Sequence, residues 1–354
     1  MNEIWLQDIR SQPAMLAESI PDMRNQAAAV AGEAGRVVLT GSGDSLIAPL
    51  AVELLYRTRL DVSVRALTAL DASRFEPLVD TTLVVVSVSG SVSRAIEIAT
   101  RARQAGAKTI AITANVDSEL ARLCDATVAM PPPIDRALPH ARDFTATLAA
   151  LIAILEALVG ERFVELDSWA ESAGDLIDQS FEWATNLESQ DSLTWFLGAG
   201  PGRASAMYGA LKFWEAGGME AWWDDLEEFA HGSQLMARPG QRVFLLASGA
   251  ATGRAVEMVP GFEQMGMIPV VVSDGVVPGP GITLPRLDTD GWFPLAACFP
   301  LQALTYVDAM RRGIDAMVPL GGRPFGATFL DVHVEWTKRS AIVDRPDTRQ
   351  APAS

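Results

Sequence analysis

The feature that most constrains the fold is a strand, glycine turn and helix pattern that occurs twice along the chain. Residues 36–56 run from the β-branched segment RVVLT through a glycine turn into a helix rich in small residues, the order found in open parallel sheets. Gly41 and Gly198 lie 157 residues apart, and Gly90 and Gly249 lie 159 residues apart. Because two separate turns recur at nearly the same offset, the sequence predicts an internal duplication.

Further strand and helix patterns in each half indicate the fold class. In the first half, strand patterns at 62–66, 81–89 and 107–114 alternate with helical ones. In the second half, the same alternation occupies 194–215 and 243–275. Strands that alternate with helices of this length favour a parallel sheet covered by helices on both faces. The prediction is an α/β protein with two tandem, doubly wound parallel sheets.

The expected division of the chain follows from this duplication. We expect an N-terminal helix plus the first sheet domain over residues 1–160, linker helices plus the second domain over 161–340, and a flexible tail over 341–354. The helical stretch from about Phe144 to Leu187 that joins the two domains should break at Gly160 and Gly174. The tail is polar and contains two prolines, a composition typical of disorder. The apolar segment 148–160 contains Glu156 and is shorter than a membrane span, so we expect a buried helix there.

Composition and charge exclude several classes of function. With 28 basic and 44 acidic residues the net charge is −16, which disfavours nucleic acid and anionic membrane surfaces as general partners. The two cysteines, Cys124 and Cys298, give neither a disulfide framework nor a metal site of cysteine ligands. Glu3 and Asp8 stand where a secretory signal would have a basic segment before an apolar core. We therefore expect a cytoplasmic protein with no metal or redox cofactor.

Two turns rich in glycine and serine are candidate sites for an anion. The first follows the strand that ends near Gly41, where free backbone N–H groups and the helix dipole favour an anion. The second, SVSGSVS at 87–93, places four hydroxyls at the sheet edge where ligands of such folds bind. A tight turn requires glycine without any ligand, and helix capping accounts for one or two serines; the two turns together favour a phosphate site. The candidate phosphate ligands are Ser42, Gly43, Ser45, Ser87, Ser89, Gly90 and Ser93.

A lysine, a glutamate and a histidine in the second half are candidate catalytic residues. Lys212 and Glu215 stand at positions i and i+3 of a predicted helix, a spacing usual in surface ion pairs. However, Lys212 is one of only three lysines in the chain, and its helix is otherwise very apolar. His231 precedes a glycine, as an ordinary turn residue often does. With Glu215 it would also provide a carboxylate base and an imidazole acid, the pair that proton transfer on a sugar requires.

These motifs are similar to those of the double sugar-isomerase-domain (SIS) family. This family includes the isomerase half of glucosamine-6-phosphate synthase, sugar-phosphate isomerases, fructosamine deglycases and amino-sugar deaminases. The resemblance covers about residues 8–315. SGDS at 42–45 and SVSG at 87–90 resemble the phosphate loops of the family, and ALKFWE at 210–215 followed by EEFAHG at 227–232 resembles its lysine, glutamate and histidine motifs.

The resemblance implies a role for each candidate residue. Ser45, Ser87 and Ser89 would bind the phosphate of a sugar phosphate. Glu215 would move a proton between C1 and C2, and Lys212 would be its structural or electrostatic partner. His231 would assist ring opening in the active site of a neighbouring subunit, which implies a homodimer.

Three departures from the family pattern leave the activity open. The phosphate-binding threonine after the second loop is replaced by Val92, with Ser91 or Ser93 as possible substitutes. The STKxFT segment of the family reads HARDFT here and begins at His140, which is therefore a candidate residue of an altered sugar pocket. No lysine stands near the C-terminus where the synthase forms an imine with its ketose, and no glutaminase domain precedes the match.

The leading hypothesis is a phosphosugar aldose–ketose isomerase or deaminating isomerase. Its substrate would be an amino-substituted sugar phosphate, and its proton transfer through an enediol or enolamine would use Glu215 as the base. One alternative is a non-catalytic sensor or regulatory protein that binds a sugar phosphate, which the altered pocket permits. Another is a fructosamine-type deglycase, which differs only in the leaving group. The sequence does not indicate which sugar phosphate is the substrate.

Overall fold

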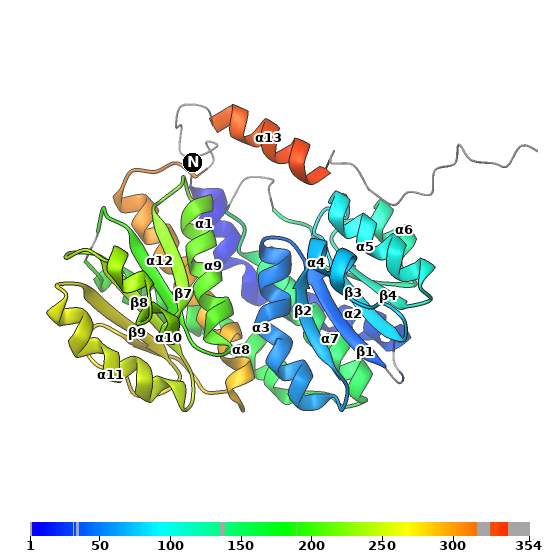
Figure 1. Cartoon of the computed structure of the whole chain (residues 1–354), viewed down its shortest axis with the longest axis horizontal. Helices are drawn as coiled ribbons and strands as arrows, with labels where there is room; N and C mark the ends of the chain where they lie inside the picture. The colour runs from blue at the N-terminus through cyan, green and yellow to red at the C-terminus, as the bar shows by residue number, and fades with distance from the viewer. Residues whose placement is uncertain are drawn as a thin grey trace, which may run out of the picture.

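The computed structural model contains two five-stranded sheets in which every paired strand of the described residues is parallel (Figure 1). The prediction of two tandem α/β sheets is therefore confirmed. The structure describes residues 2–30, 32, 35–134, 139–188, 190–316 and 326–338.

The two sheets have the same topology. The first has the order β2-β1-β3-β4-β5, and the second, read from its β7 edge, has the order β7-β6-β8-β9-β10. The strands of the first sheet are β1 (Arg36–Gly41), β2 (Val64–Thr68), β3 (Thr81–Val86), β4 (Lys108–Thr113) and β5 (Ala126–Ala129). Those of the second are β6 (Thr194–Gly198), β7 (Ala221–Asp225), β8 (Arg242–Ala247), β9 (Ile268–Ser273) and β10 (Ile282–Thr283). Equivalent strands thus follow in the same sequence order, as the duplication predicts.

Helices follow most strands and cover the sheets. In the first half they are α1 (Glu3–Arg10), α2 (Gln12–Ala27), α3 (Asp44–Arg59), α4 (Ala69–Phe75), α5 (Ser93–Gln104), α6 (Glu119–Leu123) and α7 (Arg142–Val159). In the second half they are α8 (Val164–Asn186), α9 (Gly202–Glu215), α10 (Leu226–Phe229), α11 (Ala251–Gln264), α12 (Phe293–Arg311) and α13 (Gly326–Lys338). Short 3₁₀ helices lie at η1 (Ala28–Val30), η2 (Ser233–Met236) and η3 (Asp290–Trp292).

One continuous core joins the two halves. Helices α7 and α12 are buried along almost their whole length, and their side chains belong to the same hydrophobic cluster as the inner faces of both sheets. This explains why the segment 148–160 is so apolar, and it confirms the predicted buried helix. No helix in the described part of the chain combines the length and apolarity needed to cross a bilayer.

The turn glycines are required by close backbone packing. A Cβ atom on Gly41 would lie 2.0 Å from the carbonyl oxygen of Ser45, and one on Gly198 would lie 2.2 Å from that of Gly202. Neither contact can be relieved by rotating a side chain, because backbone atoms make both. The duplicated glycines therefore have a steric reason to recur at the start of α3 and α9.

The helical region between the sheets differs in one respect from the sequence analysis. Gly160 ends α7 with a left-handed φ of 76°, at the predicted boundary of the first domain. Gly174, expected to break the following helix, instead lies inside the continuous helix α8, so that expectation was wrong. Packing against α2 and α12 offsets the modest cost of a glycine in a helix interior. The division at residue 160 stays a prediction, and the tail over 341–354 lies outside the described residues.

Candidate functional site

The candidate site lies where the first sheet's carboxyl edge meets the end of α9. Asp44 is the first residue of α3, directly after the turn that follows β1. Lys212 and Glu215 lie in the last turn of α9, and α3 and α9 pack against each other, as the ribbons side by side in Figure 1 show. This packing brings residues of both halves together.

The Lys212 ammonium group is the centre of the site. Its Nζ donates to Asp44 Oδ2 at 2.5 Å, to Glu215 Oε2 at 2.5 Å and to the carbonyl oxygen of His140 at 3.0 Å. It also lies 5.2 Å from the centroid of the Tyr208 ring. An ammonium group has three N–H donors, so all three are used, and with a side chain only 2 % exposed Lys212 is no surface partner.

The charges of this cluster change the acidity of its members. Burial raises the pKa of Glu215 to about 7, and the Asp44 carboxylate adds to the rise while Lys212 opposes it. Burial by itself would lower the pKa of Lys212, but the carboxylates of Asp44 and Glu215 outweigh it, so the pKa is raised and the group stays protonated. Glu215 is thus a carboxylate whose pKa is close to neutral pH, as a general base requires.

Two further carboxylates lie beside the cluster. Asp8 Oδ2 accepts hydrogen bonds from the backbone N–H groups of Ala141 and Arg142 at 2.7 and 3.1 Å. Asp143 Oδ2 lies 3.7 Å from Nδ1 of His140. Burial raises the pKa of Asp143 to about 7, with further contributions from Asp8 and Asp44.

Sequence reasoning missed these acidic groups as members of the site. Asp44 lies within the SGDS turn and Asp143 within the HARDFT segment, and neither carboxylate is among the residues predicted for the site. Their contacts join segments far apart in the chain, so no local periodicity points to them. The departure of HARDFT from the family pattern was the one available signal.

The first predicted phosphate turn is open to solvent. Ser42 and Gly43 are exposed, and Ser45 is half-buried in the first turn of α3. Gly43 precedes α3 with φ of 59° and provides no side chain to cap the helix. The N-terminus of α3 therefore presents backbone N–H groups toward the sheet edge, next to Asp44 and the Lys212 ammonium group.

The second predicted phosphate turn lies on the neighbouring strand. Because β1 pairs with β3 in parallel, the residues after both strands meet at one edge of the sheet. The Ser87 hydroxyl is buried and has no hydrogen-bond partner among the described residues. The Ser89 and Ser91 hydroxyls lie 2.9 Å apart, and Ser93 is buried at the start of α5.

The backbone of this second turn is fixed by its glycine. Gly90 has φ of 62°, and a Cβ atom there would lie 2.1 Å from Ser118 Oγ. Its N–H donates to the carbonyl oxygen of Ser87. Val92, which replaces the family threonine, is the N-cap residue of α5 and makes no side-chain capping bond. The side-chain donors of the turn are its serine hydroxyls.

His231 does not join this cluster within one chain. It follows α10 at the carboxyl end of β7, whereas Glu215 lies before the other end of that strand. The five residues of β7 span about 17 Å at about 3.3 Å per residue. The His231 side chain is 67 % exposed, and its Nε2 lies 3.9 Å from Glu227 Oε1.

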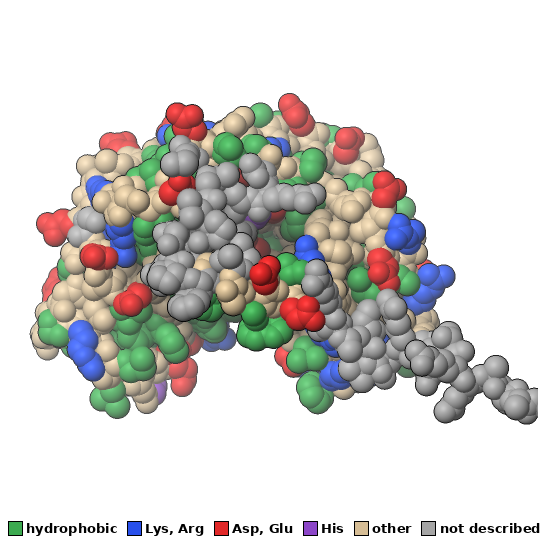
Figure 2. Space-filling model, turned by 90° about the horizontal axis from the view of Figure 1, so that it is seen from above, with side chains coloured by type: hydrophobic (Ala, Val, Ile, Leu, Met, Phe, Trp, Pro, Cys, Tyr) green, Lys and Arg blue, Asp and Glu red, His purple; other side chains and the backbone are tan. Residues whose placement is uncertain are grey.

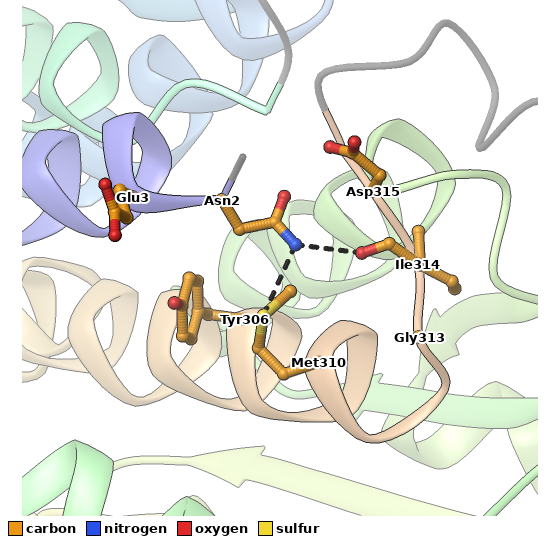
Figure 3. A pocket seen from close by; sticks show the side chains of 7 residues that line it. All are labelled: Asn2, Glu3, Tyr306, Met310, Gly313, Ile314 and Asp315. Carbon is orange, nitrogen blue, oxygen red and sulfur yellow. Dashed lines mark hydrogen bonds between the residues drawn. The ribbon is translucent and has the colours of Figure 1, made fainter.

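A separate pocket of about 390 Å³ lies where the N-terminus meets the end of α12 (Figure 3). The Asn2 side chain donates to the carbonyl oxygen of Ile314 at 2.9 Å and to Met310 Sδ at 3.3 Å. The pocket is lined by Asn2, Glu3, Tyr306, Met310, Gly313, Ile314 and Asp315. None of the predicted site residues lines it.

Comparison with known proteins identifies a family for part of the chain. Residues 32–157 match the family described as the SIS domain. A glutamine–fructose-6-phosphate aminotransferase (isomerizing) from Aeropyrum pernix is 29 % identical over 346 residues, a match that covers 89 % of this chain and 55 % of the relative. The chain therefore spans about half the length of the curated relatives it matches.

Solved structures resemble the whole fold. The tagatose-6-phosphate ketose/aldose isomerase from Escherichia coli has a TM-score of 0.72 at 18 % identity, covering 90 % of this chain and 95 % of that protein. The glucosamine-6-phosphate deaminase from Thermotoga maritima has a TM-score of 0.70 at 18 % identity, covering 86 % and 96 %. At such identities the likeness shows a shared fold with both sheets included.

Proposed function

We propose that this chain is a double SIS-domain protein and a sugar-phosphate isomerase, acting by aldose–ketose or deaminating isomerisation with Glu215 as the base. The names of its relatives and structural neighbours, which refer to fructose 6-phosphate, tagatose 6-phosphate and glucosamine 6-phosphate, support a phosphorylated sugar as the substrate. The general activity of a sugar-phosphate isomerase is supported by the similarity to SIS-domain proteins. The particular reaction and the residues that carry it out are proposed from the geometry of the site.

The observation that carries the proposal is the position of the Glu215 carboxylate. Its side chain is 17 % exposed and is linked through Lys212 to Asp44 in the first glycine turn. A carboxylate with a pKa of about 7 is partly ionised at neutral pH and is a stronger base than an ordinary carboxylate, which suits it to accept a proton from a sugar carbon and return it. The turn beside it provides donors for the phosphate of the same ligand.

In this mechanism the phosphate binds at the carboxyl edge of the first sheet. The Ser87 hydroxyl, buried and without a partner in the described chain, would donate to a phosphate oxygen together with Ser89. The N-terminus of α3 would add backbone N–H groups and its dipole. With the phosphate held there, the C1 and C2 atoms of an open-chain sugar extend toward Glu215, which moves the proton between them.

Lys212 has a supporting role in this mechanism. All three of its N–H donors are used, so no lone pair is available for attack on a carbonyl, and its positive charge is held beside Glu215. It thereby orients the carboxylate and stabilises its ionised form. An imine through Lys212 is not part of the proposal.

We further propose that His231 acts across a homodimer. Within its own chain it lies at the edge of the second sheet opposite to Glu215. Its side chain is exposed, and the short helix η2 that follows it carries the exposed apolar residues Leu235 and Met236. Figure 2 shows hydrophobic side chains on the surface of both lobes. Large exposed apolar residues are typical of protein interfaces, and docking of this surface on a second copy would bring His231 to the partner's site for ring opening.

Deuterium exchange tests the chemistry. A carboxylate that moves a proton between adjacent carbons exchanges it with solvent, so a cognate sugar phosphate in D2O should gain deuterium at C1 or C2. Glu215→Gln keeps the size of the side chain but removes the basic oxygen, and loss of a general base slows a reaction about 100- to 10,000-fold. Binding should persist. A wild-type protein that binds sugar phosphates without exchange or turnover would be a sensor rather than an isomerase.

A further inference from the structure

We propose that a buried network of two glutamines and a tyrosine positions the Glu215 carboxylate by fixing the ammonium group of Lys212. The network consists of Gln12 in α2, Gln302 in α12 and Tyr208 in α9. This inference rests on the proposed function, in which Glu215 is the base. It adds to the site two helices, α2 and α12, that carry none of its predicted residues.

A series of hydrogen bonds joins the three residues of the glutamine–tyrosine network. Nε2 of Gln12 donates to Oε1 of Gln302 at 2.7 Å, and Nε2 of Gln302 donates to the Tyr208 hydroxyl at 3.0 Å. Nε2 of Gln12 also donates to the carbonyl oxygen of Ile9 at 2.9 Å, which anchors the far end of the network at α1. The three residues are at most 2 % exposed, so water does not compete for these bonds.

The Tyr208 ring connects this network to the site. Tyr208 lies one helical turn before Lys212 on α9, and Lys212 Nζ is 5.2 Å from the ring centroid, within the range of a cation–π attraction. The ring also stacks on Phe144, with 4.0 Å between the ring centroids. Phe144 follows His140, whose carbonyl oxygen accepts from Nζ, by four residues. A shift of the Tyr208 ring would thus disturb the ammonium group and one of its acceptors.

Stability by itself does not require polar side chains at these positions. Methionine in place of each glutamine and phenylalanine in place of the tyrosine would fill similar volumes, and replacing both partners of a buried hydrogen bond by apolar groups costs little. Moreover, Oε1 of Gln12 is buried and has no hydrogen-bond partner among the described residues. A network that leaves a polar atom unpaired makes a less stable core than apolar side chains do. What its directional bonds provide is a single position for the Tyr208 ring.

The position of Lys212 Nζ affects the proposed base in two ways. Nζ donates to Glu215 Oε2 at 2.5 Å and so orients the carboxylate. The charged groups that act on Glu215 are Lys212, which lowers its pKa, and Asp44, which raises it. A displaced ammonium group would therefore misalign the carboxylate and leave less of it ionised at neutral pH. Both effects reduce the rate of proton transfer, whereas the phosphate is bound by other groups.

An apolar version of the network tests this proposal. The variant Gln12→Met/Gln302→Met/Tyr208→Phe removes the polar groups of the network and keeps the aromatic ring beside Lys212. With a cognate sugar phosphate, we expect kcat to fall about tenfold or more while KM changes by less than about twofold. The loss should be about threefold larger near pH 6 than near pH 9, because the pKa of Glu215 rises when the ammonium group moves away. Urea unfolding should show a stability close to that of the wild type.

Tyr56→Phe is the matched control. Tyr56 is also fully buried, and its hydroxyl donates to the carbonyl oxygen of Leu151 at 2.5 Å. It lies 12 residues along α3 from Asp44, or about 18 Å at about 1.5 Å per residue. This variant therefore loses the same kind of bond away from the site, and its kcat, KM and pH profile should equal those of the wild type.

Nuclear magnetic resonance measures the ammonium group without any substrate. The chain has only three lysines, so protein labelled with carbon-13 and nitrogen-15 in lysine gives few side-chain signals, and Lys212→Arg identifies the one from Lys212. We expect the apolar variant to shift this signal, because the ammonium group moves relative to the aromatic ring. Tyr56→Phe should leave the signal unchanged.

The outcomes separate this inference from the function on which it rests. Unchanged kcat and pH profile in the apolar variant overturn the inference. A lower kcat with an unshifted Lys212 signal overturns it too, because the network then does not act through the ammonium group. If the wild type turns over no sugar phosphate, the proposed function fails, and an unshifted Lys212 signal would still refute the positioning of the ammonium group. If the triple variant does not fold, Tyr208→Phe alone is measured with the same expectations.

Discussion

Asp143→Asn should stabilise the protein, and by more at higher pH. The pKa of Asp143 rises from 3.8 to about 7 because burial disfavours its ionised form and the Asp8 and Asp44 carboxylates add to the effect. Lys212 and Arg142 offset only part of this. At about 1.36 kcal/mol per pKa unit, the ionised group costs the folded state about 4 kcal/mol above pH 7. Asparagine keeps the size of the side chain and cannot ionise.

The sign of the pH dependence follows from proton binding. Between about pH 4 and pH 7 the folded protein holds the Asp143 proton more tightly than the unfolded chain does, so this group makes the free energy of unfolding fall as pH rises. The gain from Asp143→Asn should therefore grow from about 1.5 kcal/mol at pH 5 to about 4 kcal/mol at pH 8. Below pH 4 the two proteins should be almost equally stable.

Urea unfolding followed by tryptophan fluorescence measures this gain at several pH values. Differences between variant and wild type cancel the contributions of groups that do not interact with Asp143, and they report its burial together with its interactions with Asp8, Asp44 and Lys212. Asp191→Asn, which removes one charge from a side chain that is 96 % exposed, serves as the control. A variant that is less stable at pH 8, or a gain that is the same at every pH, would refute the reasoning. If unfolding is not two-state, the thermal midpoints should show the same order.

Two further predictions concern the phosphate and the assembly. Replacing both Ser87 and Ser89 by alanine should weaken sugar-phosphate binding by about 1.5 to 3 kcal/mol for each lost bond, as titration calorimetry would show; unchanged affinity would place the phosphate elsewhere. Mixing inactive Glu215→Gln subunits with inactive His231→Ala subunits should restore part of the activity, because a mixed dimer keeps one intact site. No recovery after verified subunit exchange would mean that each site is built within one chain.

The fold could be predicted because its determinants are local. The β-branched strands, the helices between them and the glycines of the turns all follow from short stretches of sequence, and the equal offset of two turns reveals the duplication. Gly41 and Gly198 illustrate the reason: each is required by a backbone atom only four residues away. Gly174 shows where prediction from local sequence fails. A glycine in a helix interior disfavours the helix, yet Gly174 lies within the continuous helix α8, which packs against α2 and α12.

The candidate site could be predicted only in part. The spacing of Lys212 and Glu215 on one helix is local, and it places them together in any helical structure. The partner of Lys212 in the first half, Asp44, is 168 residues away, and the His140 carbonyl is 72 residues away. Nothing in either segment by itself indicates that they meet at one ammonium group.

The sequence by itself thus determined the type of fold, its duplication and the residues able to act as a base, an acid or a phosphate ligand. The tertiary structure decided which of them meet: it joins Asp44 to Lys212 and Glu215, and it leaves His231 at the opposite edge of the second sheet. It also decided the acidity of Glu215 and Asp143, because a pKa depends on burial and on charges brought close by packing. Those distances are set when the two halves pack together, and no short stretch of sequence contains them.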